Sequence, residues 1–211
     1  RVSTGTFTAN GPSIIKDPSG LLLITGTGTY DANSSFTAAS ADVTFTGAGF
    51  LKLGSATVTS LGTLTEGTGT VDYDFAGNQR IKTRTYYNLR MKGSGTKDTP
   101  VGGGTPAVVT VSNDFTIDNG VTFDLATGND NLVVEGDFLN NGTFTATGQQ
   151  VTFSGASSAG ETSSLINDAS VDLIVNKSDA NGGVTFQGAS SFDNVTVADG
   201  YLDIGAYTFT A

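Results

Sequence analysis

The sequence predicts an all-β protein that winds into a parallel β-solenoid (β-helix), with a β-sandwich as the alternative fold. Thr, Ser and Gly make up 81 of the 211 residues and only 14% are charged, which is typical of β proteins with many turns. Short strand patterns alternate with turn signals along the chain. Thr-x-Thr pairs that begin at residues 25, 44, 63 and 83 recur every 19 or 20 residues, which matches one coil of many solenoids.

The clearest strand signals are Val-x-aromatic triplets, in which Val and the ring would face the interior and the middle residue would face solvent. They occur at Val43–Phe45, Val71–Tyr73, Val151–Phe153 and Val184–Phe186. Turn signals separate the strands, among them Asn10-Gly11, Asn119-Gly120, Asn141-Gly142 and Asn181-Gly182-Gly183. No 11-residue window has a helical apolar period. At about 20 to 24 residues per coil, residues 1–211 would form one elongated domain of about 9 or 10 coils.

One stretch interrupts the strand pattern. Residues 93–106 hold five of the 29 glycines and two of the four prolines. Because Pro and Gly are disfavoured inside strands, we expect an outward loop near residues 93–106.

The residue types present exclude most catalytic chemistry. The chain has no Cys, no His and no Trp, so disulfides, thiolate nucleophiles and the usual general base are missing. Two carboxylate pairs, Asp72 with Asp74 and Asp168 with Asp172, are the nearest candidates for glycoside hydrolysis. No sequence feature ties either pair to a cleft. We therefore predict no enzymatic activity, no catalytic residues and no cofactor.

Three acidic turns keep structural calcium open as an alternative, because carboxylates and amides are suitable ligands for it. They are Asp118-Asn119-Gly120, Asn129-Asp130-Asn131 and residues 179–182. Neither the EF-hand spacing nor the calcium-binding nonapeptide is present, and Asn and Asp are common turn residues in any case. No metal ligand is therefore assigned.

The net charge of −10 is unevenly distributed. Residues 1–79 carry −3, residues 80–97 carry +6 and residues 98–211 carry −13. The spacing in the basic segment places three cations on one strand face and two on another. They form either a solvated edge or a band that docks an acidic neighbour, such as the acidic half of another copy. Nucleic acid is not an expected partner, because the remaining surface would repel phosphate. The basic set is Arg80, Lys82, Arg84, Arg90, Lys92 and Lys97.

Four phrases carry a resemblance to a known group of proteins. They are GTGTVDYDFAGNQRIKTRTYYNLRMKGSGTK (67–97), VTVSNDFTIDNGVTFDL (109–125), LVVEGDFLNNGTFTATGQQVTFSGA (132–156) and FDNVTVADGYLDIGAYTFTA (192–211). These resemble the repeat units of large secreted surface proteins of Bacteroidetes-type bacteria, which are adhesin-like and filamentous. The resemblance implies a parallel β-solenoid on the outer bacterial surface. It implies no catalytic or ligand-binding position.

The expected location is extracellular, at a bacterial cell surface. The chain begins at Arg1 and reads as a mature or excised chain. Its longest apolar run, Leu21 to Ile24, is too short to cross a bilayer, so no transmembrane segment is predicted.

Both ends of the chain read as ordinary strands, without the helix or polar cap that seals isolated solenoids. Such edges would pair with another copy in a head-to-tail fibre or with neighbouring repeats of a longer chain. We therefore predict a structural, self-assembling subunit of a surface filament, or the stalk of an adhesin. The predicted assembly interface comprises Val2, Thr4, Thr6, Phe7, Thr8, Tyr207, Thr208, Phe209 and Thr210, together with Arg80, Lys82, Arg84, Arg90 and Lys92.

Two further functions remain open. A carbohydrate-binding adhesin module would stack sugar rings on exposed tyrosines, and its partner would be a polysaccharide. An ice-binding protein would present the Thr-x-Thr pairs as a ladder. The tyrosines are Tyr30, Tyr73, Tyr86, Tyr87, Tyr201 and Tyr207.

Overall fold

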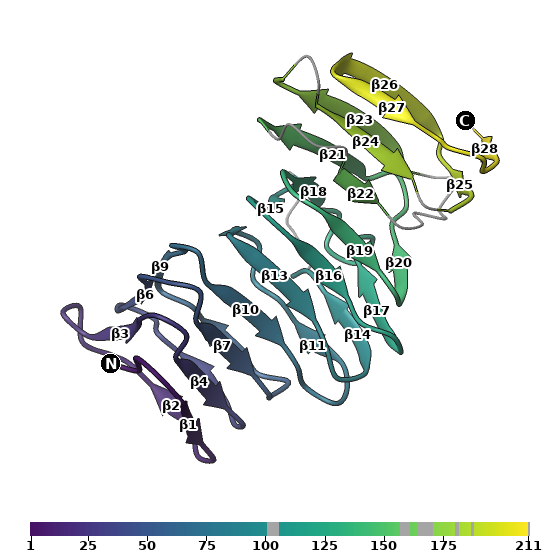
Figure 1. The fold of residues 1–211 in the computed structure, drawn as a ribbon. Helices are drawn as coiled ribbons and strands as arrows, with labels where there is room; N and C mark the ends of the chain where they lie inside the picture. The colour runs from purple at the N-terminus through teal and green to yellow at the C-terminus, as the bar shows by residue number, and fades with distance from the viewer. Residues whose placement is uncertain (101–105, 157–160, 164–170, 180–181, 187, 211) are drawn as a thin grey trace.

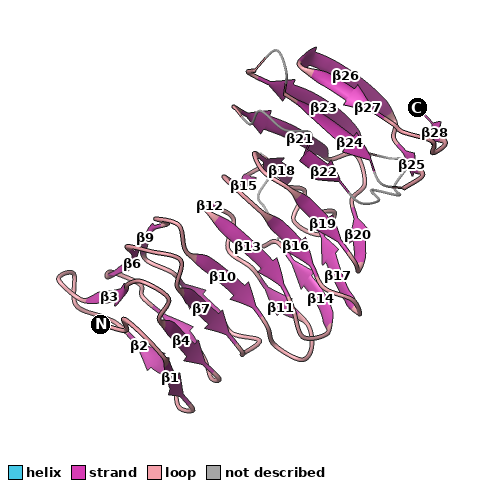
Figure 2. Cartoon of the chain, viewed as in Figure 1, coloured by secondary structure: helices cyan, strands magenta, loops and turns pink. Residues whose placement is uncertain are grey.

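The structure of the chain is a computed structural model, and it describes residues 1–100, 106–156, 161–163, 171–179, 182–186 and 188–210. These residues form strands, turns and loops, with no helix among them (Figure 2). Accordingly, the described part of the chain has no helix of the length and hydrophobicity needed to cross a membrane.

A ten-stranded parallel sheet runs along the whole molecule and receives one strand from each pass of the chain (Figure 1). Neighbours in this sheet are always in parallel register, as in the pairing of Thr29 with Phe50. The strands, in spatial order, are β1 (Thr6–Ala9), β4 (Thr29–Ala32), β7 (Phe50–Leu53), β10 (Thr70–Tyr73), β13 (Asn88–Met91), β16 (Phe115–Ile117), β19 (Phe138–Asn140), β22 (Glu161–Ser163), β24 (Gly183–Phe186) and β27 (Tyr201–Asp203).

The second side of the solenoid is divided into three shorter sheets. The first contains β2 (Ser13–Ile14), β5 (Phe36–Thr37) and β8 (Val58–Ser60). The next contains β11 (Gln79–Arg80), β14 (Gly95–Asp98), β17 (Val121–Asp124) and β20 (Thr143–Thr145), and the last contains β25 (Ser190–Ser191) and β28 (Phe209–Thr210).

The third side consists of two sheets. One contains β3 (Leu21–Ile24), β6 (Asp42–Phe45) and β9 (Thr63–Thr65). The other contains β12 (Thr85–Tyr86), β15 (Val108–Val111), β18 (Asn131–Val134), β21 (Gln150–Gly155), β23 (Asp172–Lys177) and β26 (Asn194–Asp199).

The predicted parallel β-solenoid is confirmed. Among the described residues, eight of the ten passes have a strand on all three sides, while the passes that contain β22 and β27 have two strands each. The two ends of the chain lie at opposite ends of the rod (Figure 1).

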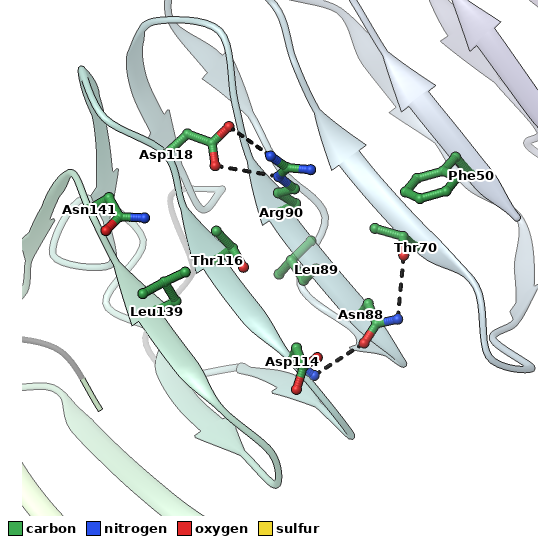
Figure 3. A pocket seen from close by; sticks show the side chains of 10 residues that line it. All are labelled: Phe50, Thr70, Asn88, Leu89, Arg90, Asp114, Thr116, Asp118, Leu139 and Asn141. Carbon is green, nitrogen blue, oxygen red and sulfur yellow. Dashed lines mark hydrogen bonds and ion pairs between the residues drawn. The ribbon is translucent and has the colours of Figure 1, made fainter. Parts of the chain in front are cut away.

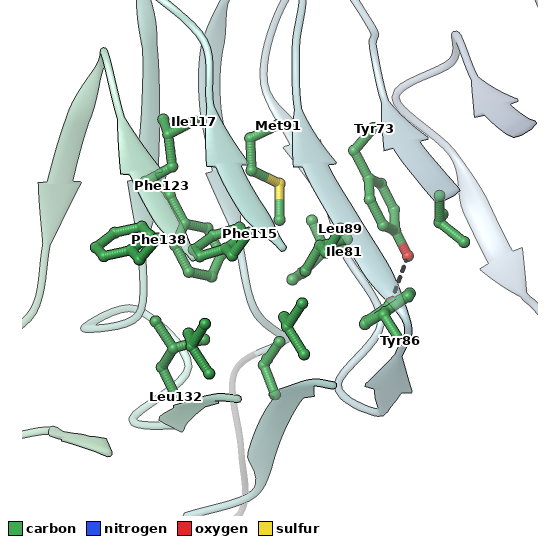
Figure 4. Close-up of a cluster of buried hydrophobic side chains, with 14 of the residues drawn as sticks. Tyr73, Ile81, Tyr86, Leu89, Met91, Phe115, Ile117, Phe123, Leu132 and Phe138 are labelled. Carbon is green, nitrogen blue, oxygen red and sulfur yellow. Dashed lines mark hydrogen bonds between the residues drawn. The ribbon is translucent and has the colours of Figure 1, made fainter. Parts of the chain in front are cut away.

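The core consists of columns of side chains that stack from coil to coil. Phe115 pairs in register with Phe138, and their rings stack with centroids 5.1 Å apart and planes 6° apart. This separation is close to the distance of about 4.8 Å between neighbouring strands, so each ring lies directly on the next. Figure 4 shows these rings with the Met91 and Leu132 side chains in the same interior.

The four Val-x-aromatic triplets lie in β6, β10, β21 and β24, and their Val and aromatic side chains are buried as predicted. The middle residues of β6, β21 and β24 are partly exposed, but Asp72 in β10 is 1% exposed. The alternation therefore predicts the interior positions well and misses this one outward-facing carboxylate.

The register inferred from the Thr-x-Thr pairs is wrong. Thr44 in β6 pairs with Leu23 on one side and with Thr65 on the other. Because the actual repeat here joins Asp42 to Thr63, the pairs that begin at 44 and 63 are two residues out of register. The hydroxyls therefore do not form the continuous ladder that the ice-binding alternative requires.

The predicted loop at residues 93–106 is also partly wrong. Residues 95–98 form β14, which pairs in parallel with both β11 and β17. Gly93 and Gly95 adopt positive φ values of 79° and 71°, which glycine tolerates without strain, so they turn the chain into this strand. Residues 101–105 lie outside the described part.

Candidate functional site: the two ends of the solenoid

At the N-terminal end, β1 has a single neighbour, β4. The carbonyls of Gly5 and Ala9 accept the N–H groups of Thr29 and Asn33. Because successive residues of a parallel strand direct their N–H and C=O groups to opposite sides, the backbone groups of Thr6 and Thr8 face away from β4. These two predicted assembly residues therefore present a strand edge.

The residues before β1 cover only part of this end. Val2 forms an isolated bridge with Ile24, donating its N–H to Leu23 and accepting that of Thr25. Thr4 is exposed. The first three residues therefore shield β3 and leave β1 and β2 with an open side.

At the C-terminal end, three strands each have one neighbour: β26, β27 and β28. Tyr201 donates its N–H to the Gly182 carbonyl in the preceding coil. The backbone N–H and C=O of Leu202, the next residue, therefore point to the open side of β27. Of the predicted residues, Tyr207 and Thr208 are exposed, and Phe209 and Thr210 form β28.

Large hydrophobic side chains gather at these two ends. Of the nine that are exposed among the described residues, seven lie in the first or the last coils. They are Phe7 (54%), Ile14 (52%) and Leu21 (52%) at one end, and Val197 (47%), Tyr201 (40%), Ile204 (39%) and Tyr207 (49%) at the other. The remaining two, Val108 and Leu139, lie along the middle of the rod.

Some of these side chains are core positions that no further coil covers. Phe7 stacks on Tyr30, with ring centroids 5.3 Å apart, and more than half of Phe7 is exposed. Val197 occupies the same column as Val175, which is 0% exposed. The interior columns therefore emerge uncovered at both ends, as a core would if it were cut between two coils.

The charges at the two ends are of opposite sign. Residues 1–24 carry two basic and one acidic side chain, whereas residues 188–210 carry three aspartates and no basic side chain. Such complementarity favours contact between unlike ends over contact between like ends.

The structure distributes the predicted basic band over different sides of the rod. Arg80 lies on β11 and forms an ion pair of 3.2 Å with Asp98. Arg90 lies on β13 in the ten-stranded sheet, where it forms two hydrogen bonds with Asp118, of 3.4 and 3.2 Å. Two of the predicted docking cations thus already have carboxylate partners within the chain.

Lys92 and Lys97 also have local roles. Lys92 contributes, with Arg90 and Lys52, positive charge around the carboxyl of Asp72. Lys97 is 0% exposed, and its ammonium group donates to the carbonyls of Phe75, Gly77 and Ser94 at 2.6, 2.9 and 3.0 Å. Lys82 and Arg84, by contrast, form no ion pair with a carboxylate of the described residues.

A hollow of about 350 Å³ lies on the outer face of the ten-stranded sheet (Figure 3). Phe50 and Leu139 provide apolar surface at opposite sides of it, and Asn88 lies between them with its amide bonded to Thr70 and Asn113. The Arg90–Asp118 ion pair lies at one edge. Apolar surface combined with amide, hydroxyl and carboxylate groups is suited to a polyol.

The other sequence-based candidates contribute less. Tyr73 and Tyr86 are fully buried and joined at 2.9 Å, so they cannot stack on a sugar. Asp72 lies in β10 and Asp74 follows the end of that strand, and each has an Oδ1 atom without a hydrogen-bond partner among the described residues. Asp168, Ala180 and Asn181 lie outside the described residues.

The acidic turns make contacts within the protein. Asp118 pairs with Arg90, and Asp130 accepts the Thr83 hydroxyl at 3.0 Å and the Ala107 N–H at 2.9 Å. In the described part of the chain, no three Asp or Glu side chains lie together as a metal site would require.

Comparisons with protein-family models, with curated proteins and with solved structures find no match to this chain.

Proposed function

We propose that this chain is a non-enzymatic, extracellular structural protein whose copies associate end to end, through their terminal strands, into a surface filament or stalk. The observation that supports this proposal is the coincidence of unpaired strand edges and uncovered core columns at both ends. Open edges add strands readily, and exposed apolar side chains gain about 25 cal/mol per Å² when they are buried.

Head-to-tail contact would extend the fold without changing it. The last coil of one copy would lie against the first coil of the next and continue the ladders and the core columns. Because the contact joins unlike surfaces, it leaves a free surface at each end and grows into a fibre. Neighbouring coils of a longer chain would use the same surfaces.

The experiment compares an exposed apolar residue at the end with one in the middle of the rod. Phe7→Lys places a charge on the uncovered core column of β1, whereas Leu139→Lys introduces the same charge at a similarly exposed site in β19. We expect wild type and Leu139→Lys to form long particles at high concentration in electron micrographs, and Phe7→Lys to stay monomeric. Monomers for wild type at every concentration would overturn the proposal.

A carbohydrate-binding module is the second candidate, and the hollow beside Phe50 and Leu139 favours it. Binding of neutral oligosaccharides that is lost in Leu139→Lys but retained in Phe7→Lys would support this second function. The same pair of variants therefore distinguishes the two proposals.

A further inference from the structure

The junction between the third and fourth coils differs from the others. Of the three sides, only the ten-stranded sheet continues across it, because β8 and β9 end their sheets and β11 and β12 begin new ones. Side chains replace the missing ladders there. The Gln79 amide donates to the carbonyls of Leu53 and Ser55 at 2.6 and 2.8 Å, and Arg84 donates to that of Gly62 at 2.8 Å.

A cavity of about 290 Å³ opens at this junction. Its walls carry two cations and three hydroxyl groups, and no acidic residue lines it in the part of the chain that the structure describes. The lining residues are Thr59, Ser60, Leu61, Gly62, Lys82, Thr83, Arg84 and Pro100.

The two cations lack a carboxylate partner. No hydrogen bond or ion pair engages the Lys82 ammonium among the described residues, and Arg84 uses a single N–H group on Gly62. The neighbouring carboxylates are occupied, Asp98 by Arg80 and Asp130 by Thr83 and Ala107. Burial, together with repulsion from Arg80 and Arg84, lowers the pKa of Lys82. An anion between these groups would relieve that repulsion.

A buried pair of tyrosines holds the backbone of Lys82 in place. Its N–H donates to the Tyr73 hydroxyl at 3.0 Å, and its carbonyl accepts the Tyr86 hydroxyl. The Tyr86 hydroxyl donates its hydrogen to this carbonyl. In the 2.9 Å hydrogen bond between the two hydroxyls, Tyr73 is therefore the donor and Tyr86 the acceptor. Burial raises the pKa of Tyr73 to about 12 and that of Tyr86 as well, so both protons stay in place. The cationic site is therefore built on a fixed backbone.

We propose that this cavity binds an anionic sugar unit of an acidic polysaccharide, with its carboxylate or sulfate group between Lys82 and Arg84. The free N–H groups of the arginine suit the paired oxygens of such a group. The volume exceeds that of the anionic group alone and leaves room for the ring that carries it, with the hydroxyls of Thr59 and Ser60 beside it. This inference does not depend on end-to-end association.

The test is a calorimetric titration at a concentration where the protein is monomeric. The probes are a galacturonic acid oligomer, a neutral galactose oligomer and inorganic sulfate. We expect saturable binding of the acidic oligomer, at least tenfold weaker binding of sulfate and no binding of the neutral oligomer. Sulfate binding as tightly as the oligomer would contradict recognition of a sugar unit, and no saturable binding of any anion would overturn the site.

Matched variants locate the site. Lys82→Gln removes one cation from the cavity, and Lys16→Gln makes the same charge change on the exposed first coil. We expect Lys82→Gln to weaken binding of the acidic oligomer at least tenfold and Lys16→Gln less than twofold, with unchanged circular dichroism in both. Arg84→Lys should also weaken binding, because it keeps the charge but loses the planar fork. Equal weakening by Lys82→Gln and Lys16→Gln would mean general charge attraction and would refute the site.

Discussion

Asp72 carries a carboxyl group that is 1% exposed and has no hydrogen-bond partner on Oδ1. Its strand neighbours across the ten-stranded sheet are Lys52 and Arg90. Burial raises the pKa of Asp72 to about 6, and Asp74 adds to this increase, while Lys92, Arg90 and Lys52 oppose it. The nearby cations therefore compensate only part of the cost of burying this charge.

We expect Asp72→Asn to stabilise the protein by about 3 kcal/mol at pH 7.5, since each unit of pKa shift corresponds to about 1.4 kcal/mol. The folded pKa lies above the ordinary value of 3.8 for Asp, so the group contributes stability below pH 3.8 and loses that contribution as the pH rises through about 6. The extra stability of the variant over wild type should therefore decrease as the pH falls from 6 to 3.8. Urea denaturation of both proteins across this pH range measures the difference in their unfolding free energies. A difference that is independent of pH would contradict a raised pKa for Asp72.

Lys97 is also a buried charged residue, but unlike Asp72 it has all its hydrogen-bond partners. Its three donors all reach backbone carbonyls, of which those of Phe75 and Gly77 lie in the turn after β10. A lysine in a basic segment is most simply interpreted as a surface residue. Its burial depends on an inward-facing position in β14, where it pairs with Gln79 and Phe123, and this register is invisible before the coils are aligned.

At the scale of strands, the sequence predicts the interior of the solenoid better than its register. Val-x-aromatic triplets identify buried positions because an interior strand face needs large apolar side chains. Thr-x-Thr pairs fail as markers of register, because Thr suits any outward position of a strand. The coil length also varies, since Thr70 pairs with Asn88 but Leu89 pairs with Phe115, so a fixed period aligns only neighbouring coils.

The same limit applies to the ends. Thr6, Phe7 and Thr8 were identifiable because they open the chain in a plain strand pattern. Ile14 and Leu21 were missed, although each is 52% exposed. A short apolar segment in sequence indicates a core strand, and only the assembled coil shows that these two side chains point outward.

The edge of β1 gives a test of strand pairing that spares the fold. The Thr8 N–H faces away from β4, so Thr8→Pro removes a donor that forms no hydrogen bond with the described residues. We expect this variant to keep its circular dichroism spectrum and to lose association at least tenfold, whereas Thr8→Val, which retains the N–H, associates like wild type. Sedimentation velocity over a concentration series measures the difference. Equal association of the two variants would mean that β1 does not pair with another strand.

At the scale of the whole molecule, the solenoid is a rod with two unlike ends. One end presents β1 and β2 with the Phe7 ring, and the other presents β26, β27 and β28 with Val197 and Tyr201. The net charge of −10 opposes association of the rods as wholes. The opposite charges at the ends act locally against that repulsion, so they favour contact along the axis over contact side by side.

The most direct test of head-to-tail association mixes two variants, each blocked at one end. Phe7→Lys blocks the first coil and Val197→Lys blocks the last, so each variant alone has a single functional end. If the contact is head to tail, analytical ultracentrifugation should find each variant monomeric, and their equimolar mixture should form a dimer and nothing larger. Dimers of either variant alone, or a mixture that stays monomeric at concentrations where wild type assembles, would contradict it.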